Sequence, residues 1–421
     1  MRQHRSATRL PALLGGRPAF QPGLPFARPA RPALDRVMKR VEASYERGML
    51  TNGPLVAELE DRIAARLGVT HVVATSSCTA GLMLALRAVT DDRPGHVVLP
   101  SFTFSASAHA VAWNGRIPRF VECDPHTFQI DLDDATAALD GASALLATHI
   151  FGAPCDPDEL VRRADHFGVP VLFDAAHAMG ALADDRPIGR FGEAEVFSLT
   201  PTKPLVAGEG GLVSTNDSGL AEAIRVGRDY GNPGDYDTRF VGLNARMSEF
   251  HAAVALESLE TFEETLERRR DLAMRYRLGL AGVPGVSVQL VPAHFVSTYK
   301  DFSVTIDPTV FGLTRDQLVT ALSAEGVDTR NYFDPPVHRQ QSYRYLDPVH
   351  LPVTERLASS IVSLPLHSEM GDGDVDRVVE VVHDAHRHAD AIVALLGRES
   401  HVGPRRVIDL RAHDHSSTLH R

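Results

Sequence analysis

The segment EVFSLTPTKPLVAGEGGLVST (residues 195–215) places a single lysine between two short apolar runs. Lys203 stands among small and apolar residues, and the nearest other basic residues are Arg190 and Arg225. A lysine at the end of a buried strand is costly to keep charged, because desolvation lowers its pKa from about 10.4. The neutral amine that results can attack a carbonyl group. On these residues alone, a structural lysine whose amine reaches solvent explains the segment equally well.

The two apolar runs, residues 195–199 and 211–215, are the last of seven candidate strands. The Gly-rich turn between them is too short for a crossover helix, so one of the two is expected to run antiparallel. The earlier strands alternate with segments long enough for helices, which predicts a mostly parallel α/β sheet buried on both faces. These earlier strands are predicted at residues 71–75, 96–100, 119–123, 144–148 and 170–174.

The flanking parts of the chain have a different character. A Pro- and Gly-rich arm over residues 1–33 cannot form an amphipathic helix and is expected to lie on the protein surface. We predict a large domain over 34–265, then a smaller α+β domain over 266–397 and a mobile tail over 398–421. The small domain is predicted to contain strands at 286–290 and 301–306, a helix near 315–325 and a last helix over 373–396.

The composition limits the classes of function. The chain has 421 residues and a net charge of -11, which argues against non-specific binding to nucleic acid. No apolar run approaches the roughly 18–20 residues that span a bilayer. The three cysteines, Cys78, Cys123 and Cys155, are too few for a disulfide framework. We therefore expect a cytoplasmic protein in a reducing environment.

Several polar residues follow candidate strands, where ligands bind in open α/β sheets. Thr79 lies at the start of a helix, just after Ser76 and Ser77, and a helix N-terminus binds phosphate well. Simple capping explains that placement nearly as well. Asp174 ends an apolar strand, with His177 three residues later. A buried carboxylate usually needs a cationic partner, although capping of the strand end is an alternative role.

Together, an amine, a carboxylate and a helix N-terminus are the groups that an aldehyde-bearing, phosphorylated pyridine requires. The amine of Lys203 would meet the aldehyde, Asp174 the ring nitrogen, and the helix start at Thr79 the phosphate. Phe104 follows another strand, where its ring can stack on a pyridine. The combination favours a pyridoxal-phosphate site over the separate structural interpretations of each residue.

The chain resembles the DegT/DnrJ/EryC1/StrS family of sugar aminotransferases, which are fold type I pyridoxal-phosphate enzymes. The resemblance extends from about residue 34 to 395 and implies pyridoxal 5′-phosphate as the cofactor. It rests on segments in the family's order: TNGPLVAELE, SSCTAGLMLAL, PSFTFSASAHAVAWNG, FDAAHAMGA, FSLTPTKPLVAGEGG, GLNARMSE and SLPLHSEM.

The resemblance implies roles for individual residues. Lys203 matches the lysine that binds the cofactor's aldehyde covalently, and Asp174 matches the partner of the pyridinium nitrogen. His177 matches a position that contacts the cofactor's phenolic oxygen, and Phe104 matches the stacking aromatic. The remaining matches concern the phosphate: Thr79 and Ala80 at the helix start, Ser198 through its hydroxyl, and Asn244 from the neighbouring subunit. A homodimer with shared active sites is therefore implied.

The sequence departs from the family pattern at two positions. Cys78 stands where glycine is usual, and Leu243 stands where an aromatic residue is usual. These changes leave the chemistry intact but weaken any transfer of substrate preference. His338, in a segment that resembles the loop closing over the substrate, is a candidate substrate contact, and a structural histidine is an equal alternative.

The resemblance implies transfer of an amino group, usually from L-glutamate, to a keto-sugar in amino-sugar or antibiotic biosynthesis. We favour a nucleotide-linked acceptor over a keto-cyclitol, because a diphosphate needs cations and five arginines lie in the expected substrate segments: Arg228, Arg239, Arg246, Arg330 and Arg339. Lys203 argues against the related dehydratases, which carry histidine there. A non-catalytic regulator is expected to have lost some of the cofactor-site residues, and all of them are present here. A solvated helix face, rather than a metal site, explains His383, His386 and His388.

Overall fold

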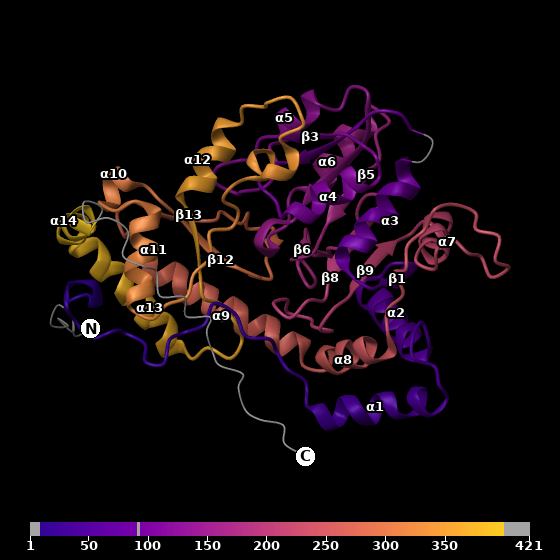
Figure 1. Cartoon of the computed structure of the whole chain (residues 1–421), viewed down its shortest axis with the longest axis horizontal. Helices are drawn as coiled ribbons and strands as arrows, with labels where there is room; N and C mark the ends of the chain where they lie inside the picture. The colour runs from indigo at the N-terminus through magenta and orange to yellow at the C-terminus, as the bar shows by residue number, and fades with distance from the viewer. Residues whose placement is uncertain (1–8, 91–92, 400–421) are drawn as a thin grey trace, which may run out of the picture.

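The fold is described by a computed structural model for residues 9–90 and 93–399. Within these ranges the chain forms a larger α/β part and a smaller α+β part, and its N-terminal segment passes along both (Figure 1). The predicted tail falls outside the described residues from position 400 onward, as do the first eight residues of the arm. The domain boundaries expected at 33, 265 and 397 remain predictions.

A seven-stranded sheet forms the centre of the larger part. Its strand order is β1-β9-β8-β5-β4-β2-β3, and only β9 runs antiparallel to its neighbours among these strands. This confirms the predicted fold class and the antiparallel strand after the Gly-rich turn. The strands are β1 (His71–Thr75), β2 (His96–Pro100), β3 (Pro118–Val121), β4 (Ala142–Thr148), β5 (Val171–Asp174), β8 (Ala194–Ser198) and β9 (Gly211–Thr215).

Helices cover both faces of this sheet, because its strands alternate apolar side chains between two hydrophobic cores. On β1, for example, Val72 and Ala74 belong to one core and Val73 to the other. One face carries α3 (Cys78–Thr90), α4 (Ser105–Trp113) and α7 (Ser218–Gly227). The other face carries α2 (Pro54–Leu67), α5 (Leu132–Ala137), α6 (Pro157–Asp165) and α8 (Glu249–Leu259), with α1 (Leu34–Glu46) packed on α8.

The smaller part follows the long helix α9 (Phe262–Leu280). Its antiparallel sheet has the order β10-β12-β13. The strands are β10 (Val286–Val288), β12 (Phe302–Ile306) and β13 (Ile361–Leu364). The helices are α10 (Pro308–Phe311), α11 (Arg315–Ala324), α12 (Pro352–Ser360), α13 (Asp372–Arg387) and α14 (Ala389–Glu399). The single last helix expected over 373–396 is therefore two helices, separated at His388, whose backbone is not helical (φ −108°, ψ 18°).

A small third sheet joins the two parts of the chain. It has the order β11-β6-β7 and was not expected from the sequence, because each strand has only two residues. Strand β11 (Phe295–Val296) comes from the smaller part, and β6 (Leu182–Ala183) and β7 (Arg186–Pro187) come from the larger one. The backbone of segment 295–300 is thereby held beside the carboxyl ends of the central strands.

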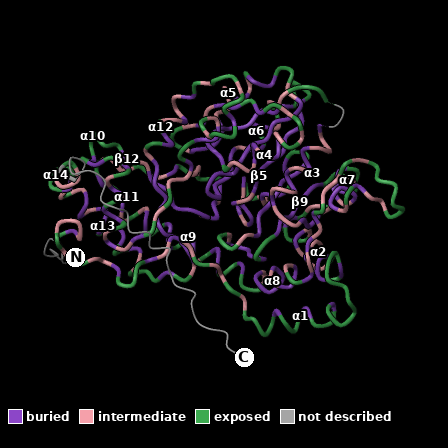
Figure 2. The backbone as a smooth tube through the Cα atoms, viewed as in Figure 1, coloured by how far each residue is buried: buried purple, intermediate pink, exposed green. Residues whose placement is uncertain are grey.

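The N-terminal arm packs on the smaller part before the chain reaches α1. Arg9 forms an ion pair of 2.7 Å with Glu325, and the backbone N–H groups of Ala12 and Ala19 donate to the same carboxylate. Leu24 pairs with Val327 in a parallel bridge. Figure 2 shows that the central strands are buried, whereas α1 and the loop after α7 are largely exposed. None of the described helices is both long and apolar enough to cross a bilayer.

Candidate active site

A cavity of about 290 Å³ lies at the carboxyl ends of the central strands. It is lined by residues that follow β1, β2, β4, β5 and β8, and by residues of the smaller part. The fold brings six of the predicted site residues to this one cavity: Thr79, Phe104, Asp174, His177, Ser198 and Lys203. Chain segments that are more than 100 residues apart thus supply one site, as expected for an open α/β sheet.

Lys203 reaches the cavity from the turn that follows β8. Its backbone N–H donates to the Thr200 carbonyl over 3.0 Å, which closes the turn. Desolvation, followed by repulsion from the nearby Lys300, lowers the pKa of the Lys203 amine from 10.5 to about 7. A large fraction of this amine is therefore neutral at physiological pH and able to act as a nucleophile or base.

Asp174 is the last residue of β5, and its carboxylate is buried with 3% of the residue exposed. The Ser107 hydroxyl donates to Oδ2 over 2.6 Å, and the Ala176 N–H donates to Oδ1 over 3.0 Å. Burial raises the pKa of Asp174, although these two hydrogen bonds oppose the shift. The carboxylate forms no ion pair with any described residue, so a cationic N–H in the cavity would supply its missing partner.

His177 faces the cavity as a neutral imidazole. Its Nδ1 accepts a hydrogen bond of 3.2 Å from the backbone N–H of Phe151, which places the ring proton on Nε2. Burial lowers the pKa of His177 well below 6.5, because the charged form is poorly solvated there. The ring lies nearly parallel to that of Phe151, at 9° and 6.4 Å between centroids. His177 is thus positioned to donate its Nε2–H to an acceptor in the cavity.

The helix start at α3 forms another wall of the cavity. Thr79 lies in the first turn, where backbone N–H groups have no partner within the helix. The N–H of Ala80, in contrast, donates to the Ser77 hydroxyl over 3.1 Å, and Ala80 does not line the cavity. Gly211 at the start of β9 permits this packing, because a Cβ there would lie 2.6 Å from the backbone of Ser77 and Cys78.

Two predicted residues lie elsewhere. Asn244 is exposed outside this cavity, and its Oδ1 accepts a hydrogen bond of 3.4 Å from Arg246. His338 has both ring nitrogens engaged, with Ser101 Oγ at 2.6 Å and Glu355 Oε1 at 3.0 Å. Within this chain, neither residue is brought to the Lys203 cavity, and their roles toward cofactor and substrate remain predictions.

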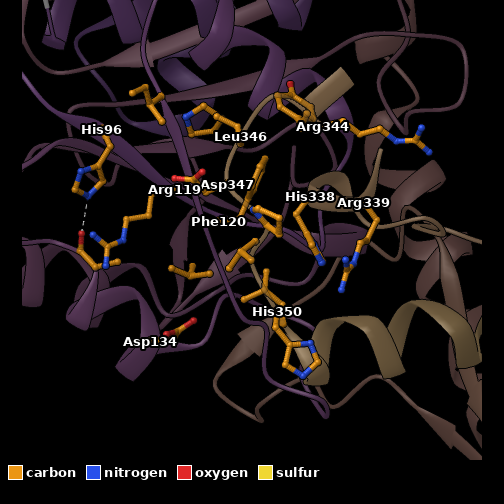
Figure 3. Close-up of a pocket in the computed structure, with 18 of the residues that line it drawn as sticks. His96, Arg119, Phe120, Asp134, His338, Arg339, Arg344, Leu346, Asp347 and His350 are labelled. Carbon is orange, nitrogen blue, oxygen red and sulfur yellow. Dashed lines mark hydrogen bonds between the residues drawn. The ribbon is translucent and has the colours of Figure 1, made fainter. Parts of the chain in front are cut away.

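His338 instead lines a second, more open cavity of about 990 Å³ (Figure 3). This cavity lies between the edge strand β3 and the segment 338–351, which contains the 3₁₀ turn η4 (Gln341–Tyr343). Figure 3 shows His338 and Arg339 side by side at one end and His96 at the other, where His96 bonds to the Ala138 carbonyl at 2.9 Å. The cavity contains none of the Lys203 site residues.

His383 and His386 on α13, and His388 directly after it, each contact a backbone carbonyl. His383 bonds to Gly279 at 3.1 Å, His386 to Phe311 at 2.9 Å, and His388 to Asp384 at 2.9 Å. In the part of the chain that the structure describes, no group of three or more His, Cys, Asp or Glu residues could hold a metal ion.

Lys300, Tyr332 and Phe333 of the smaller part also line the cavity, and none of them was predicted individually. Tyr332 and Phe333 lie in the segment 331–343 that resembles the loop closing over the substrate, although that segment suggested His338 as the contact. Lys300 comes directly before the strand predicted at residues 301–306 and received no role from the sequence. The sequence did contain one sign of such a site. Lys300 and Asp301 are adjacent at the start of an apolar strand, where burying charged groups is costly.

The profile of the DegT/DnrJ/EryC1/StrS aminotransferase family matches residues 34–383 of this sequence. The chain belongs to this family. It is 32% identical over 372 residues to the spore coat polysaccharide biosynthesis protein SpsC of Bacillus subtilis, covering 84% of this chain and 95% of SpsC. These findings confirm the family that the sequence motifs indicated.

Solved structures of this family share the fold. The crystal structure of DesI, determined in the presence of its TDP-sugar product, is 40% identical with a TM-score of 0.85, covering 92% of this chain and 98% of DesI. The structure of DesV from S. venezuelae is 31% identical with a TM-score of 0.77, covering 86% of this chain and 99% of DesV. The chain is therefore a pyridoxal-phosphate-dependent aminotransferase of a sugar aminotransferase family, as expected.

The cavity fits this cofactor, since its buried Asp174 carboxylate lacks a cationic partner and its Lys203 amine is largely neutral. When bound, pyridoxal phosphate supplies an aldehyde that reacts with amines and a ring that accepts the electrons of a carbanion. Asp174 would hold the protonated ring nitrogen, and His177 would donate to the phenolic oxygen. Lys203 Nζ would accept a proton from the α-carbon of an amino donor and return it later.

Proposed function

We propose that this aminotransferase moves an amino group from L-glutamate to a nucleotide-linked keto-sugar. The observation that carries the proposal is the likeness to DesI, whose structure was determined with its TDP-sugar product. This chain shares 40% identity with DesI over 92% of its length. The name of SpsC refers to polysaccharide biosynthesis, so we place the reaction in amino-sugar biosynthesis, with antibiotic biosynthesis as one setting for it.

The arginines expected to bind a diphosphate differ in their availability. Arg239 is exposed and has no side-chain partner within the described parts of the chain, 9–90 and 93–399. The other four form ion pairs within the chain: Arg228 with Glu60, Arg246 with Asp229, Arg330 with Asp328, and Arg339 with Glu355. Arg239 is thus the first candidate for a nucleotide contact, because binding there breaks no existing ion pair.

The acceptor can be identified in single half-reactions. The enzyme is first converted with L-glutamate, which removes the visible absorption band of the loaded protein. dTDP- and UDP-linked keto-sugars and keto-inositols are then offered separately, and the return of the band is recorded. We expect return with a nucleotide-linked sugar. Return with a keto-inositol and with no nucleotide sugar would replace this proposal by a cyclitol aminotransferase.

We also propose a homodimer in which Asn244 of one subunit reaches the cofactor phosphate of the other. Exposed apolar side chains support it, because α1, the turn after it and the start of α8 carry Leu34, Met38, Tyr45, Met49, Leu50 and Phe250. The loop after α7 also projects from the body and carries Tyr236, which is 94% exposed (Figure 1).

Shared sites can be tested with inactive variants. Lys203→Ala and Asn244→Ala subunits, when mixed, are expected to form heterodimers with one intact site, so part of the activity returns. A monomer in sedimentation would contradict the dimer.

A cytoplasmic location is proposed as well, supported by three cysteines that are buried and free.

A further inference from the structure

Lysine is rare in this chain, and two of its three lysines line the same cavity. Of 43 Lys and Arg residues, only Lys39, Lys203 and Lys300 are lysines. Lys39 is an exposed residue of α1, whereas Lys203 and Lys300 both line the cavity at the carboxyl ends of the sheet. Lys203 has a role in proton transfer. Nothing in that chemistry uses Lys300, so its presence there requires a separate explanation.

Lys300 is held rigidly at the wall of the cavity. Its backbone N–H donates to the Phe151 carbonyl over 3.0 Å, and the Arg269 guanidinium donates to its carbonyl over 2.5 Å. The ammonium Nζ lies 2.9 Å from both carboxylate oxygens of Asp301 and 5.4 Å from the centre of the Tyr332 ring. Only about 5% of Lys300 is exposed, so its position is set by the fold rather than by solvent.

A buried ion pair of this kind contributes little to folding, because desolvating two charges costs about as much as their attraction returns. An ammonium group has three N–H donors, and Asp301 takes at most two of them. Of the other groups that line the cavity, His177 is neutral and Lys203 is needed as a neutral base. Lys300 is therefore the cation of this cavity that remains available to an anionic ligand.

The two half-reactions of an aminotransferase place different demands on this cavity. The amino donor brings a carboxylate, which needs a cation after it leaves water. The sugar ring that replaces it brings hydroxyl groups and no charge at that end. An unpaired lysine would favour the donor and would remain uncompensated when the sugar binds. A lysine with its own carboxylate can serve both ligands.

We propose that Lys300 binds a carboxylate of the amino donor, and that Asp301 neutralises Lys300 when the uncharged sugar occupies the cavity. The proposal rests on the proposed carboxylate-bearing donor. It makes Lys300 a specificity residue for the donor and Asp301 a residue that limits how tightly the donor binds.

The test measures binding of glutarate, a dicarboxylate without an amine, to the loaded enzyme by calorimetry. Lys300→Met is expected to weaken glutarate binding about 10- to 100-fold, as for loss of a charge-assisted hydrogen bond. Asp301→Asn is expected to tighten it several-fold, because the ammonium is no longer neutralised. Lys300→Arg should retain part of the affinity, and Lys39→Met is the matched control that should leave it unchanged.

Half-reaction rates then locate the carboxylate. Equal losses in Lys300→Met with L-alanine and L-glutamate assign the α-carboxylate, and a loss with L-glutamate alone assigns the side-chain carboxylate. Glutarate affinity within twofold of wild type in both Lys300→Met and Asp301→Asn would overturn the proposal. The two variants are expected to change glutarate affinity in opposite directions. If one of them folds poorly, the direction of the change in the other still tests the proposal. If wild type rejects L-glutamate, the proposed donor fails, but glutarate binding still tests Lys300.

Discussion

The ring of Phe26 packs edge-on against the ring of Tyr332, with 5.9 Å between the ring centroids. Phe26 belongs to the N-terminal arm, which precedes the region matched by the family profile. Tyr332 lines the Lys203 cavity and lies over the Lys300 ammonium. The Phe26 carbonyl also accepts a hydrogen bond from the Leu366 N–H over 3.3 Å, so both the backbone and the side chain of Phe26 contact the smaller part of the chain. The arm thus supports one wall of the candidate active site.

Phe26→Ala is expected to raise KM several-fold with a smaller change in kcat, because Tyr332 loses its support while the Lys203 chemistry is untouched. Phe20→Ala is the matched control. Phe20 is similarly buried in the arm but packs against Arg377 rather than Tyr332. Both variants are expected to unfold more easily, by roughly 3–5 kcal/mol for a buried phenylalanine. Steady-state kinetics and urea unfolding separate the two effects. Equal changes of KM in both variants would argue against a positioning role for Phe26.

Lys203 is expected to reduce the stability of the cofactor-free protein near neutral pH. The folded amine releases its proton near pH 7, and the unfolded one near pH 10.5. Between these values the unfolded chain binds one more proton, so the free energy of unfolding rises with pH across this window. Lys203→Met should therefore stabilise the cofactor-free protein at pH 7.5 by a few kcal/mol, at about 1.4 kcal/mol per pKa unit.

The gain from Lys203→Met should shrink towards zero above pH 10.5, where the amine is neutral in both states. Urea unfolding of the cofactor-free wild type and variant at pH 7.5, 9 and 10.5 measures it. An equal difference at all three values would mean that packing of the methionine, and not desolvation of the amine, is responsible.

His177 is expected to act through its Nε2–H, because Phe151 occupies Nδ1. His177→Gln can still donate a hydrogen bond and should keep kcat within about tenfold of wild type, whereas His177→Leu cannot and should lower it about 100-fold. The pH profile of wild type should show no step from His177 between pH 6 and 8, because burial holds its pKa well below 6.5. Kinetics and the visible spectrum of the loaded protein measure both. A leucine variant with wild-type rate and spectrum would exclude this role.

The sequence predicted the sheet and the residues at its strand ends, because each is a local signal. Asp174 and Lys203 are isolated polar residues beside apolar runs, and strand ends in such a sheet converge. Lys300 could not be placed, because its contact with Phe151 is a single backbone hydrogen bond between residues 149 positions apart. The break at His388 was missed because no proline or glycine marks it, and apolar periodicity continues across it.

Asp174→Asn is expected to lower kcat at least about 100-fold without weakening the cofactor-free fold. Burial raises the pKa of Asp174, so the folded state disfavours its charge at neutral pH, and a neutral amide removes that cost. The amide cannot, however, stabilise a protonated ring nitrogen as a carboxylate does. Ser107→Ala is the comparison. It removes the 2.6 Å hydrogen bond to Asp174 but keeps the carboxylate charge, and it should lower kcat about tenfold. Wild-type activity in Asp174→Asn would leave Asp174 only a structural role at the end of β5.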